Sequence, residues 1–215
     1  MKRIPFLAAA LVAAAFALPV HAQDTMKKDA AVKPADPELK VVLDSWNDIG
    51  RKLIAMAEDF PEDKYDYKPT PESRSIKSTL AHIATLTTFP TMLHGERIPI
   101  EKIDFMEYMK KVQADEATLD TKDKIVAALK DRGEAFAKML EGLNDEKFFA
   151  EQITFRPGAT PPSRTRFDLL LAAKEHEMHH RGQLMLLQRM IGLTPHLTRE
   201  QQERMKQFQA QQAKA

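Results

Sequence analysis

Apolar residues recur at spacings of three and four along most of this chain. This spacing places side chains on one face of an α-helix, because an α-helix has 3.6 residues per turn. No segment alternates between apolar and polar residues over a useful length, which would indicate a half-buried strand. The pattern therefore predicts an all-α protein.

The first two predicted helices are each followed by a proline. One runs from Leu39 to Ala57 and ends where Phe60 is followed by proline, since proline cannot continue a helix. The next runs from Ile76 to Thr87 and is ended or kinked by Pro90. Its candidate N-caps are Ser73 and Ser75.

Two longer helices follow. One carries its apolar stripe from Ile125 to Leu143, and the other runs from about Phe167 to Ile191 and stops at Gly192. Their candidate N-caps are, in order, Asp120 or Thr121 and Ser163 or Thr165. Four long helices with short to medium connections predict a four-helix bundle, which we place at residues 38–197.

The connections are less well defined. Ile100 to Leu119 is ambiguous, with a possible short helix from Phe105 to Val112. Phe148 to Phe155 is expected to be extended or a frayed helix end, and Arg156 to Pro162 is a loop. Residues 198–215 are rich in Gln and have little to bury, so we treat them as a C-terminal tail that could continue as a helix.

The N-terminus has the pattern of a secretory signal peptide. A basic start, Met1-Lys2-Arg3, precedes an apolar stretch from Ile4 to Val20, with small residues up to Ala22. An apolar run of roughly 16 residues is short for a membrane span. We therefore expect cleavage after Ala22, a flexible leader at residues 23–37, and a periplasmic or secreted protein that has no membrane contact after cleavage.

Composition narrows the chemistry. The 215 residues suit one domain, and 32 Lys and Arg against 31 Asp and Glu leave no basic footprint for a nucleic acid. The chain has no Cys, so an exported protein of this sequence has no disulfides. Any metal site must be built from His, Asp, Glu and solvent.

Three of the seven histidines lie inside the last predicted helix, in a stretch of five residues from His176 to His180. His176 and His180 are four residues apart and share one helical face, where we expect them to point into the bundle. His179 falls at the edge of this face, Gln183 faces inward one turn on, and Glu177 starts at the wrong angle for the core. Paired imidazoles at this spacing are typical of a metal site, although two hydrogen-bonded core histidines are the alternative.

A third ligand has to come from another helix. His82 lies on the apolar face of the second helix and is the best candidate. His94, beyond Pro90, is expected at the surface, and His196 has no helical partner. Three neutral histidines would hold one divalent ion with positions open to water or substrate. Zinc or nickel fits best, and iron or manganese also accepts imidazole.

Four stretches in this order resemble the DinB family (DinB/YfiT-like proteins): Tyr67–Ser75, Leu80–Ala84, His176–Leu184 and Arg189–Pro195. The resemblance implies a four-helix bundle with a divalent metal held by three histidines, here His82, His176 and His180. It also implies a small-molecule substrate, with thiol-dependent transferases among the family's members, and a possible homodimer.

Three functions are compatible with these residues. The first is a metal-dependent hydrolase or thiol transferase, in which His179, Gln183 and Glu177 are candidates for positioning or proton transfer. The second is a non-catalytic metal-binding or stress-related protein. The third is a helical scaffold whose core histidines are satisfied by hydrogen bonds.

Overall fold

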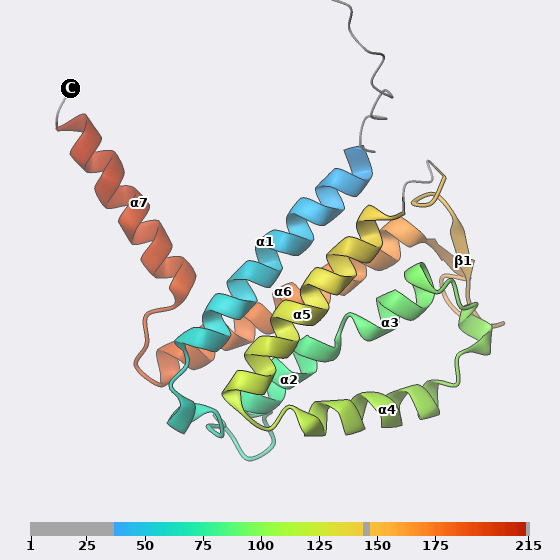
Figure 1. Ribbon diagram of the computed structural model, residues 1–215, viewed down its shortest axis with the longest axis horizontal. Helices are drawn as coiled ribbons and strands as arrows, with labels where there is room; N and C mark the ends of the chain where they lie inside the picture. Colours follow the sequence, from blue (N-terminus) through green and yellow to red (C-terminus); the bar gives the residue numbers. More distant parts are fainter. Residues whose placement is uncertain (1–36, 144–146, 214–215) are drawn as a thin grey trace, which may run out of the picture. The chain divides into compact units, whose positions relative to one another are not determined.

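The computed structural model describes residues 37–143 and 147–213. The predicted signal peptide (residues 1–22) and almost all of the predicted leader (residues 23–37) lie outside these residues. Four long helices form the framework: α1 (Pro37–Asp59), α2 (Ile76–Thr85), α5 (Lys122–Glu141) and α6 (Arg166–Met190). Each of α1 and α2 contacts both α5 and α6, as a four-helix bundle requires (Figure 1). The predicted fold class is confirmed.

Helix starts follow the capping rules. Ser75, Thr121 and Thr165 each adopt extended backbone, and each side chain accepts a hydrogen bond from a backbone N–H three residues later. These bonds satisfy donors that have no partner inside the helix. In each predicted pair of candidate caps, the second residue is the cap.

The second helix is broken, as the position of Pro90 suggests. It ends at Thr85 and continues as the short turn α3 (Thr88–Pro90) and a π-helical turn, η2 (Thr91–Gly95). In η2, the Glu96 N–H bonds to the Thr91 carbonyl at 2.9 Å, an i to i+5 bond that widens the helix. This turn places His94 in the interior.

Two connections have more regular structure than the prediction gave them: the possible helix at Phe105 is longer, and the stretch Phe148–Phe155, expected to be extended or frayed, contains a strand. Helix α4 (Phe105–Thr118) continues six residues past the predicted end at Val112, and the Asp104 carboxylate caps it. Strands β1 (Gln152–Thr154) and β2 (Ser163–Thr165) pair antiparallel, Ile153 opposite Arg164. Strands of three residues are too short to show an alternating pattern. The remaining short elements are the 3₁₀ turns η1 (Glu62–Lys64) and η3 (Ile100–Lys102).

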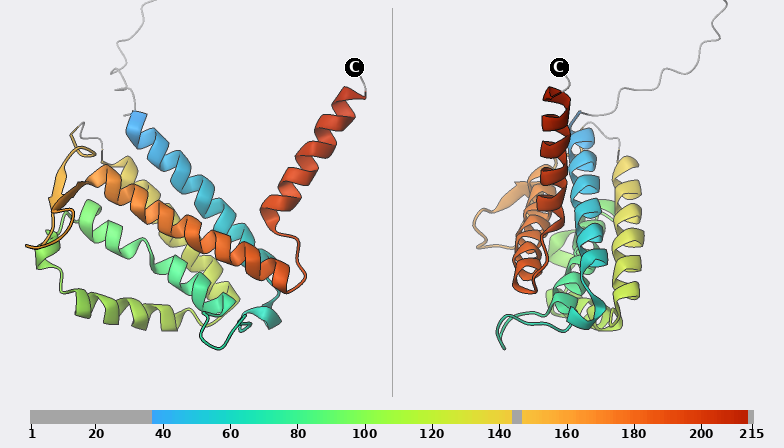
Figure 2. Two further views of the ribbon diagram at one scale, coloured as in Figure 1. Left: turned by 180° about the vertical axis from the view of Figure 1, so that it is seen from behind. Right: turned by 90° about the vertical axis from the view of Figure 1, so that its left-hand side faces the viewer.

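The core consists of two clusters of buried side chains. One lies around Leu53, Phe60 and Leu184, and the other around Trp46 and Phe136, whose ring centroids are 4.1 Å apart. Both views in Figure 2 show α1, α5 and α6, which supply much of this core, side by side. The burial of apolar side chains in these two clusters stabilises a chain that has no disulfides.

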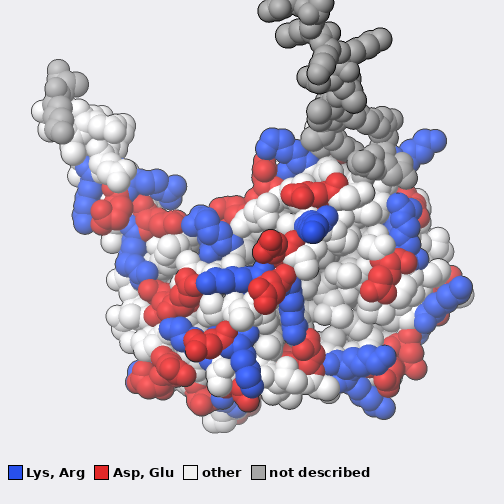
Figure 3. Space-filling model, in the orientation of Figure 1, with Lys and Arg blue, Asp and Glu red and all other residues white. Residues whose placement is uncertain are grey.

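The Gln-rich segment forms a helix, α7 (His196–Gln212), that has no buried residue. Arg199 holds its start to α1 through a two-pronged ion pair with Asp59, with N–O distances of 2.7 and 2.9 Å. Lys and Arg alternate with Asp and Glu over the face in Figure 3, which has no extended region of one sign. Within residues 37–143 and 147–213, no helix is long and apolar enough to cross a bilayer.

Candidate metal centre

Helices α2 and α6 bring three histidines together. Ring nitrogens of His82, His176 and His180 all lie within 4.8 Å of one another. The His82 ring centroid is 5.5 Å from that of His176 and 5.0 Å from that of His180. These are the three residues that the sequence selected as metal ligands.

The two histidines of α6 differ in exposure. His180 is buried, with 6% of its surface exposed, whereas His176 is exposed. The buried face of α6 includes Leu170, Lys174 and Glu177, so it is turned away from the face expected from the sequence. The prediction that His176 points into the bundle is therefore wrong: His176 lies at the margin of the core, where an ion would remain accessible.

His82 is oriented by an acidic residue from another helix. Its Nδ1 lies 2.7 Å from Oε1 of Glu116 in α4. The same carboxylate accepts a bond from the Thr85 hydroxyl at 3.4 Å, and Arg74 lies 3.7 Å from its other oxygen. With its Nδ1–H donated to Glu116, His82 keeps a lone pair on Nε2, the arrangement that commonly orients metal-ligating histidines.

His180 is held by a neighbour on its own helix. Its Nδ1 donates to Oε1 of Gln183 at 2.9 Å, and the Gln183 amide nitrogen donates to Nε2 of His179, also at 2.9 Å. The sequence named both Gln183 and His179 as supporting residues. With Nδ1 used as the donor, the lone pair of His180 is on Nε2, as at His82.

The two Nε2 atoms of α6 face each other. Those of His176 and His180 are 2.9 Å apart, a hydrogen-bond distance. Since His180 uses its proton on Nδ1, His176 must donate through Nε2 in the metal-free protein. Moving this proton to the His176 Nδ1 would leave three lone pairs converging on one point.

Burial keeps these ligands neutral. It lowers the pKa of His180 to about 4, and the neighbouring His82 adds to the effect of burial. Burial also lowers the pKa of His176, with His82 and His179 as further causes. A neutral imidazole has the lone pair that a metal requires, so protons compete poorly for these two ligands at pH 7.

The distances fit a divalent transition metal. Metal–nitrogen bonds of about 2.0–2.1 Å place cis or tetrahedral ligand atoms roughly 2.9–3.4 Å apart. The His176–His180 separation of 2.9 Å lies in this range. The ring nitrogens of the cluster lie up to 4.8 Å apart. To bind the same ion, the His82 nitrogen would have to move about 1–2 Å towards the other two, which a side-chain rotation can supply.

Glu177 does not belong to this centre. It is buried with 5% exposure, and its carboxylate lies 2.7 Å from the Lys174 ammonium. The ammonium lies 3.7 Å from the Trp46 ring centroid. The prediction that Glu177 faces away from the core is wrong. It took the histidines and aliphatic residues of α6 to mark the buried face, whereas the Lys174–Glu177 ion pair occupies part of that face.

Two other histidines also differ from the prediction. His94 is 1% exposed, not a surface residue, because the π-helical turn rotates it inward. Burial lowers its pKa to about 4, and Arg166 contributes in the same direction. His196 begins α7, where its Nε2 lies 3.0 Å from the Glu200 carboxylate one turn on.

Glu116 is the residue that sequence reasoning missed. It is 34 positions from His82 and lies in the segment whose structure was ambiguous. A helix predicted as far as Thr118, the observed end of α4, would have placed the Glu116 side chain on its last turn. Its contact with His82 depends on how α4 packs against α2, and no local pattern encodes that packing.

Comparison with known proteins agrees with this arrangement. A family model described as the DinB superfamily matches residues 46–184. A DinB-like protein from Bacillus subtilis (YjoA) has a similar fold, with 23% identity and a TM-score of 0.54 over 72% of this chain and 93% of that one. One from Bacillus cereus gives 19% identity and a TM-score of 0.54 over 73% and 94%.

No curated protein matches the sequence significantly. The likeness to the two Bacillus structures therefore concerns the fold, and the family assignment rests on a match that covers more than half of the chain. The predicted resemblance is confirmed: this chain belongs to the DinB superfamily.

Proposed function

We propose that this protein is exported and that His82, His176 and His180 hold one divalent metal ion, which serves a hydrolase or thiol transferase acting on a small molecule. The observation that carries the proposal is the convergence of ring nitrogens from three histidines within 4.8 Å. The bonds to Glu116 and Gln183 use Nδ1 of His82 and His180, so both rings carry their lone pair on Nε2, and that of His180 accepts a hydrogen bond from His176. A hydrogen-bonded pair accounts for the contact between His176 and His180, but not for the third ring nitrogen, which His82 brings from another helix.

The chain's own residues would hold and orient the ligands. Glu116 would fix the tautomer and orientation of the His82 ring, and Gln183 would do the same for the His180 ring. When bound, a divalent ion supplies a Lewis acid that acidifies water or a thiol and polarises a carbonyl. The described cluster contains three protein ligands, and catalytic sites of this type keep further positions for water or substrate.

Export is proposed on the N-terminal pattern alone. The basic start, the apolar stretch from Ile4 to Val20 and the small residue Ala22 before the cleavage position match a cleavable signal peptide. N-terminal sequencing of the protein recovered from a periplasmic extract would test this, with Gln23 as the expected first residue.

Metal analysis is the test of the site. The exported protein, purified without a His tag, is expected to contain about one divalent ion per chain. His82→Ala and the double variant His176→Ala/His180→Ala should both lose it, whereas the control His196→Ala, outside the cluster, should retain it. A wild-type protein that neither contains nor takes up metal would overturn the proposal. A loaded protein that is inactive on ester, amide and thiol-transfer substrates would favour a non-catalytic metal-binding role.

A further inference from the structure

A cavity of about 430 Å³ begins at the metal centre and continues into the protein. His82 and His176 are part of its lining, so the cluster and the cavity are continuous. Most of the wall is apolar or aromatic, supplied by α3, η2, α4 and α6, and includes Leu93, Phe89, Phe105, Tyr108, Leu169 and Ala172. Small-molecule sites typically have this size and lining.

The cavity has no charged wall. Among the described residues, no Asp, Glu, Lys or Arg lines it. Burial raises the pKa of the Tyr108 phenol, which therefore stays protonated at neutral pH. An occupant that extends away from the metal centre would therefore meet aromatic rings, aliphatic side chains and neutral polar groups.

His94 is a polar residue of this lining that does not belong to the histidine cluster. The side chain is 1% exposed, and its Nδ1 has no hydrogen-bond partner among the described residues. Buried polar atoms are paired in the great majority of cases, so an unpaired ring nitrogen in a residue that lines a cavity indicates a missing partner. Neighbouring atoms cover Nδ1, so an occupant of the cavity would meet it after a rotation of the ring. The lowered pKa makes the imidazole neutral, with one donor and one acceptor.

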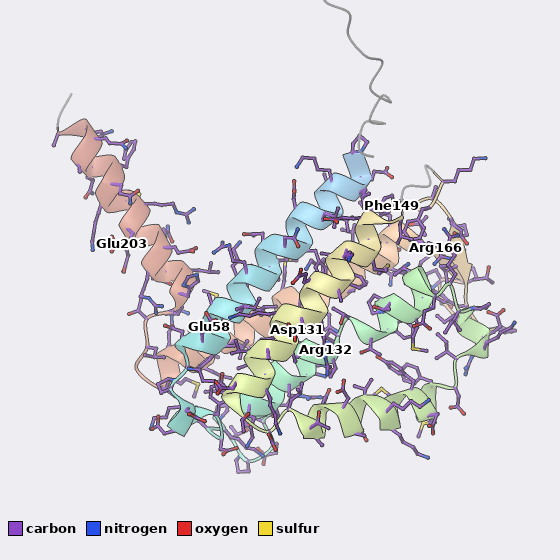
Figure 4. The ribbon with its side chains drawn as sticks, in the orientation of Figure 1. Glu58, Asp131, Arg132, Phe149, Arg166 and Glu203 are labelled. Atoms are coloured by element: carbon purple, nitrogen blue, oxygen red, sulfur yellow. The ribbon has the colours of Figure 1, made fainter. Side chains whose placement is uncertain are left out.

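The surroundings of His94 are well fixed. The Arg166 guanidinium donates to the Leu93 carbonyl at 2.5 Å and to the Glu151 carboxylate at 2.8 and 3.0 Å. The His94 ring also packs against Phe148, with ring centroids 6.1 Å apart. Figure 4 labels Arg166 where α6 begins, at the opposite end of the helix from α7. The imidazole is thus positioned by groups that already have their own partners.

The cavity extends over a useful length. Leu169 and His176, which both line it, are seven residues apart in α6, or about 10 Å at 1.5 Å per residue. A ligand that spans the cavity therefore has a body of about 10 Å or more.

We propose that this cavity binds an elongated, mainly apolar small molecule, with a metal-binding group at the His82–His176 end and a hydrogen-bonding group at the His94 end. The metal-binding end rests on the proposed function. The apolar body and the His94 contact do not, so they are testable in the metal-free protein.

The first experiment uses N-phenyl-1-naphthylamine, a neutral aromatic dye with one N–H, titrated by fluorescence into the full-length metal-free protein. Saturable binding is expected. Ala172→Phe fills the cavity and should weaken it at least tenfold. The matched control Leu171→Phe, at the neighbouring position with 46% exposure, should leave it within twofold. His94→Leu should weaken it about threefold to tenfold through loss of one hydrogen bond.

The second experiment uses the metal-loaded protein and compares acetohydroxamate with octanohydroxamate. Burial of apolar surface is worth about fourfold per methylene, so the longer compound should bind at least a hundredfold more tightly. Ala172→Phe should remove most of this advantage and leave acetohydroxamate binding unchanged.

The outcomes separate the two proposals. Dye binding that Ala172→Phe does not affect, or equal affinities for the two hydroxamates, would overturn the cavity proposal whatever the metal content. Dye binding that responds to Ala172→Phe in a protein that takes up no metal would support the apolar site and contradict the metal centre. Dye binding that is insensitive to His94→Leu would remove the polar contact from the proposal.

Discussion

Helix α6 carries two polar pairs that use their hydrogen-bonding capacity in different ways. Lys174 and Glu177 are each 5% exposed, and their charged groups lie 2.7 Å apart. The ammonium also lies 3.4 Å from the Trp46 carbonyl. His176 and His180, on the adjoining face, have Nε2 atoms 2.9 Å apart and receive a third ring nitrogen from His82.

The difference shows that burial of polar groups does not by itself mark a functional site. In the Lys174–Glu177 pair, each charged group binds the other, so the pair directs no hydrogen-bonding group towards a ligand. Burial lowers the pKa of Lys174 and raises that of Glu177, while their mutual attraction acts in the opposite direction. In the histidine cluster, by contrast, one proton joins His176 to His180, and its transfer to Nδ1 of His176 would leave three lone pairs converging on one point.

The largest effect is expected when the buried ion pair is broken. Lys174→Met leaves the Glu177 carboxyl in the core without its counter-charge, which should lower the free energy of unfolding by about 3–5 kcal/mol. Urea denaturation measures this change, and metal affinity should stay within threefold. The control Lys174→Met/Glu177→Leu should recover most of the stability. A single variant as stable as the wild type would show that the pair does not stabilise the core.

Removing the acceptor that holds His82 should lower metal affinity, in contrast to the effect of Lys174→Met on stability. Glu116→Ala is expected to weaken metal affinity about 10–100-fold, because the imidazole loses the acceptor that orients it. Competition with a chelator measures the affinity. The control Glu107→Ala changes an exposed glutamate of the same helix and should have no effect on binding. Equal affinities for both variants would exclude Glu116 from the centre.

Acid should affect His94, a buried group without a partner. Its pKa is about 4 in the folded protein and about 6.5 when unfolded, so the unfolded chain binds more protons between these values. Stability must therefore fall as the pH is lowered through this window, by about 2 kcal/mol from pH 7 to pH 5 for this residue.

The variant His94→Leu isolates this contribution. Measured by urea denaturation of the metal-free protein, its loss of stability between pH 7 and pH 5 should be about 2 kcal/mol smaller than that of the wild type. His180 titrates in both proteins and cancels in the difference. Identical pH profiles would show that His94 is protonated as readily in the folded as in the unfolded chain.

The smallest effect is expected at His179, which hydrogen-bonds to Gln183 and packs its ring against His180 with centroids 5.1 Å apart. His179→Ala should weaken metal affinity less than threefold, whereas Gln183→Leu, which removes the acceptor of His180 itself, should weaken it more. The same chelator competition measures both. A larger effect at His179 than at Gln183 would indicate that His179 is a ligand.

Several features were predictable because they depend on short stretches of chain. Ser75, Thr121 and Thr165 could be named as caps, since an N-cap bond spans three residues. The i, i+4 spacing of His176 and His180 places both rings together on any helix. His82 could be added because it is the histidine in the middle of the second helical stripe.

The errors concern packing between distant segments. Which face of α6 is buried depends on α1, where Trp46 receives Lys174 through its ring and carbonyl. The inward position of His94 depends on a π-helical turn after Pro90, and the partner of His82 comes from a helix 34 residues away. Periodicity carries no information on any of these contacts.

By itself the sequence determined that this is an α-helical bundle with three histidines able to share a metal, because helical periodicity, capping and i, i+4 spacing are local properties. The tertiary structure decided that Glu116 supports His82, that Lys174 and Glu177 close on each other, and that a cavity leads from the cluster to His94. These features depend on the docking of α4 and α6 against their neighbours, a balance of burial and pairing over the whole core that no short stretch of chain encodes.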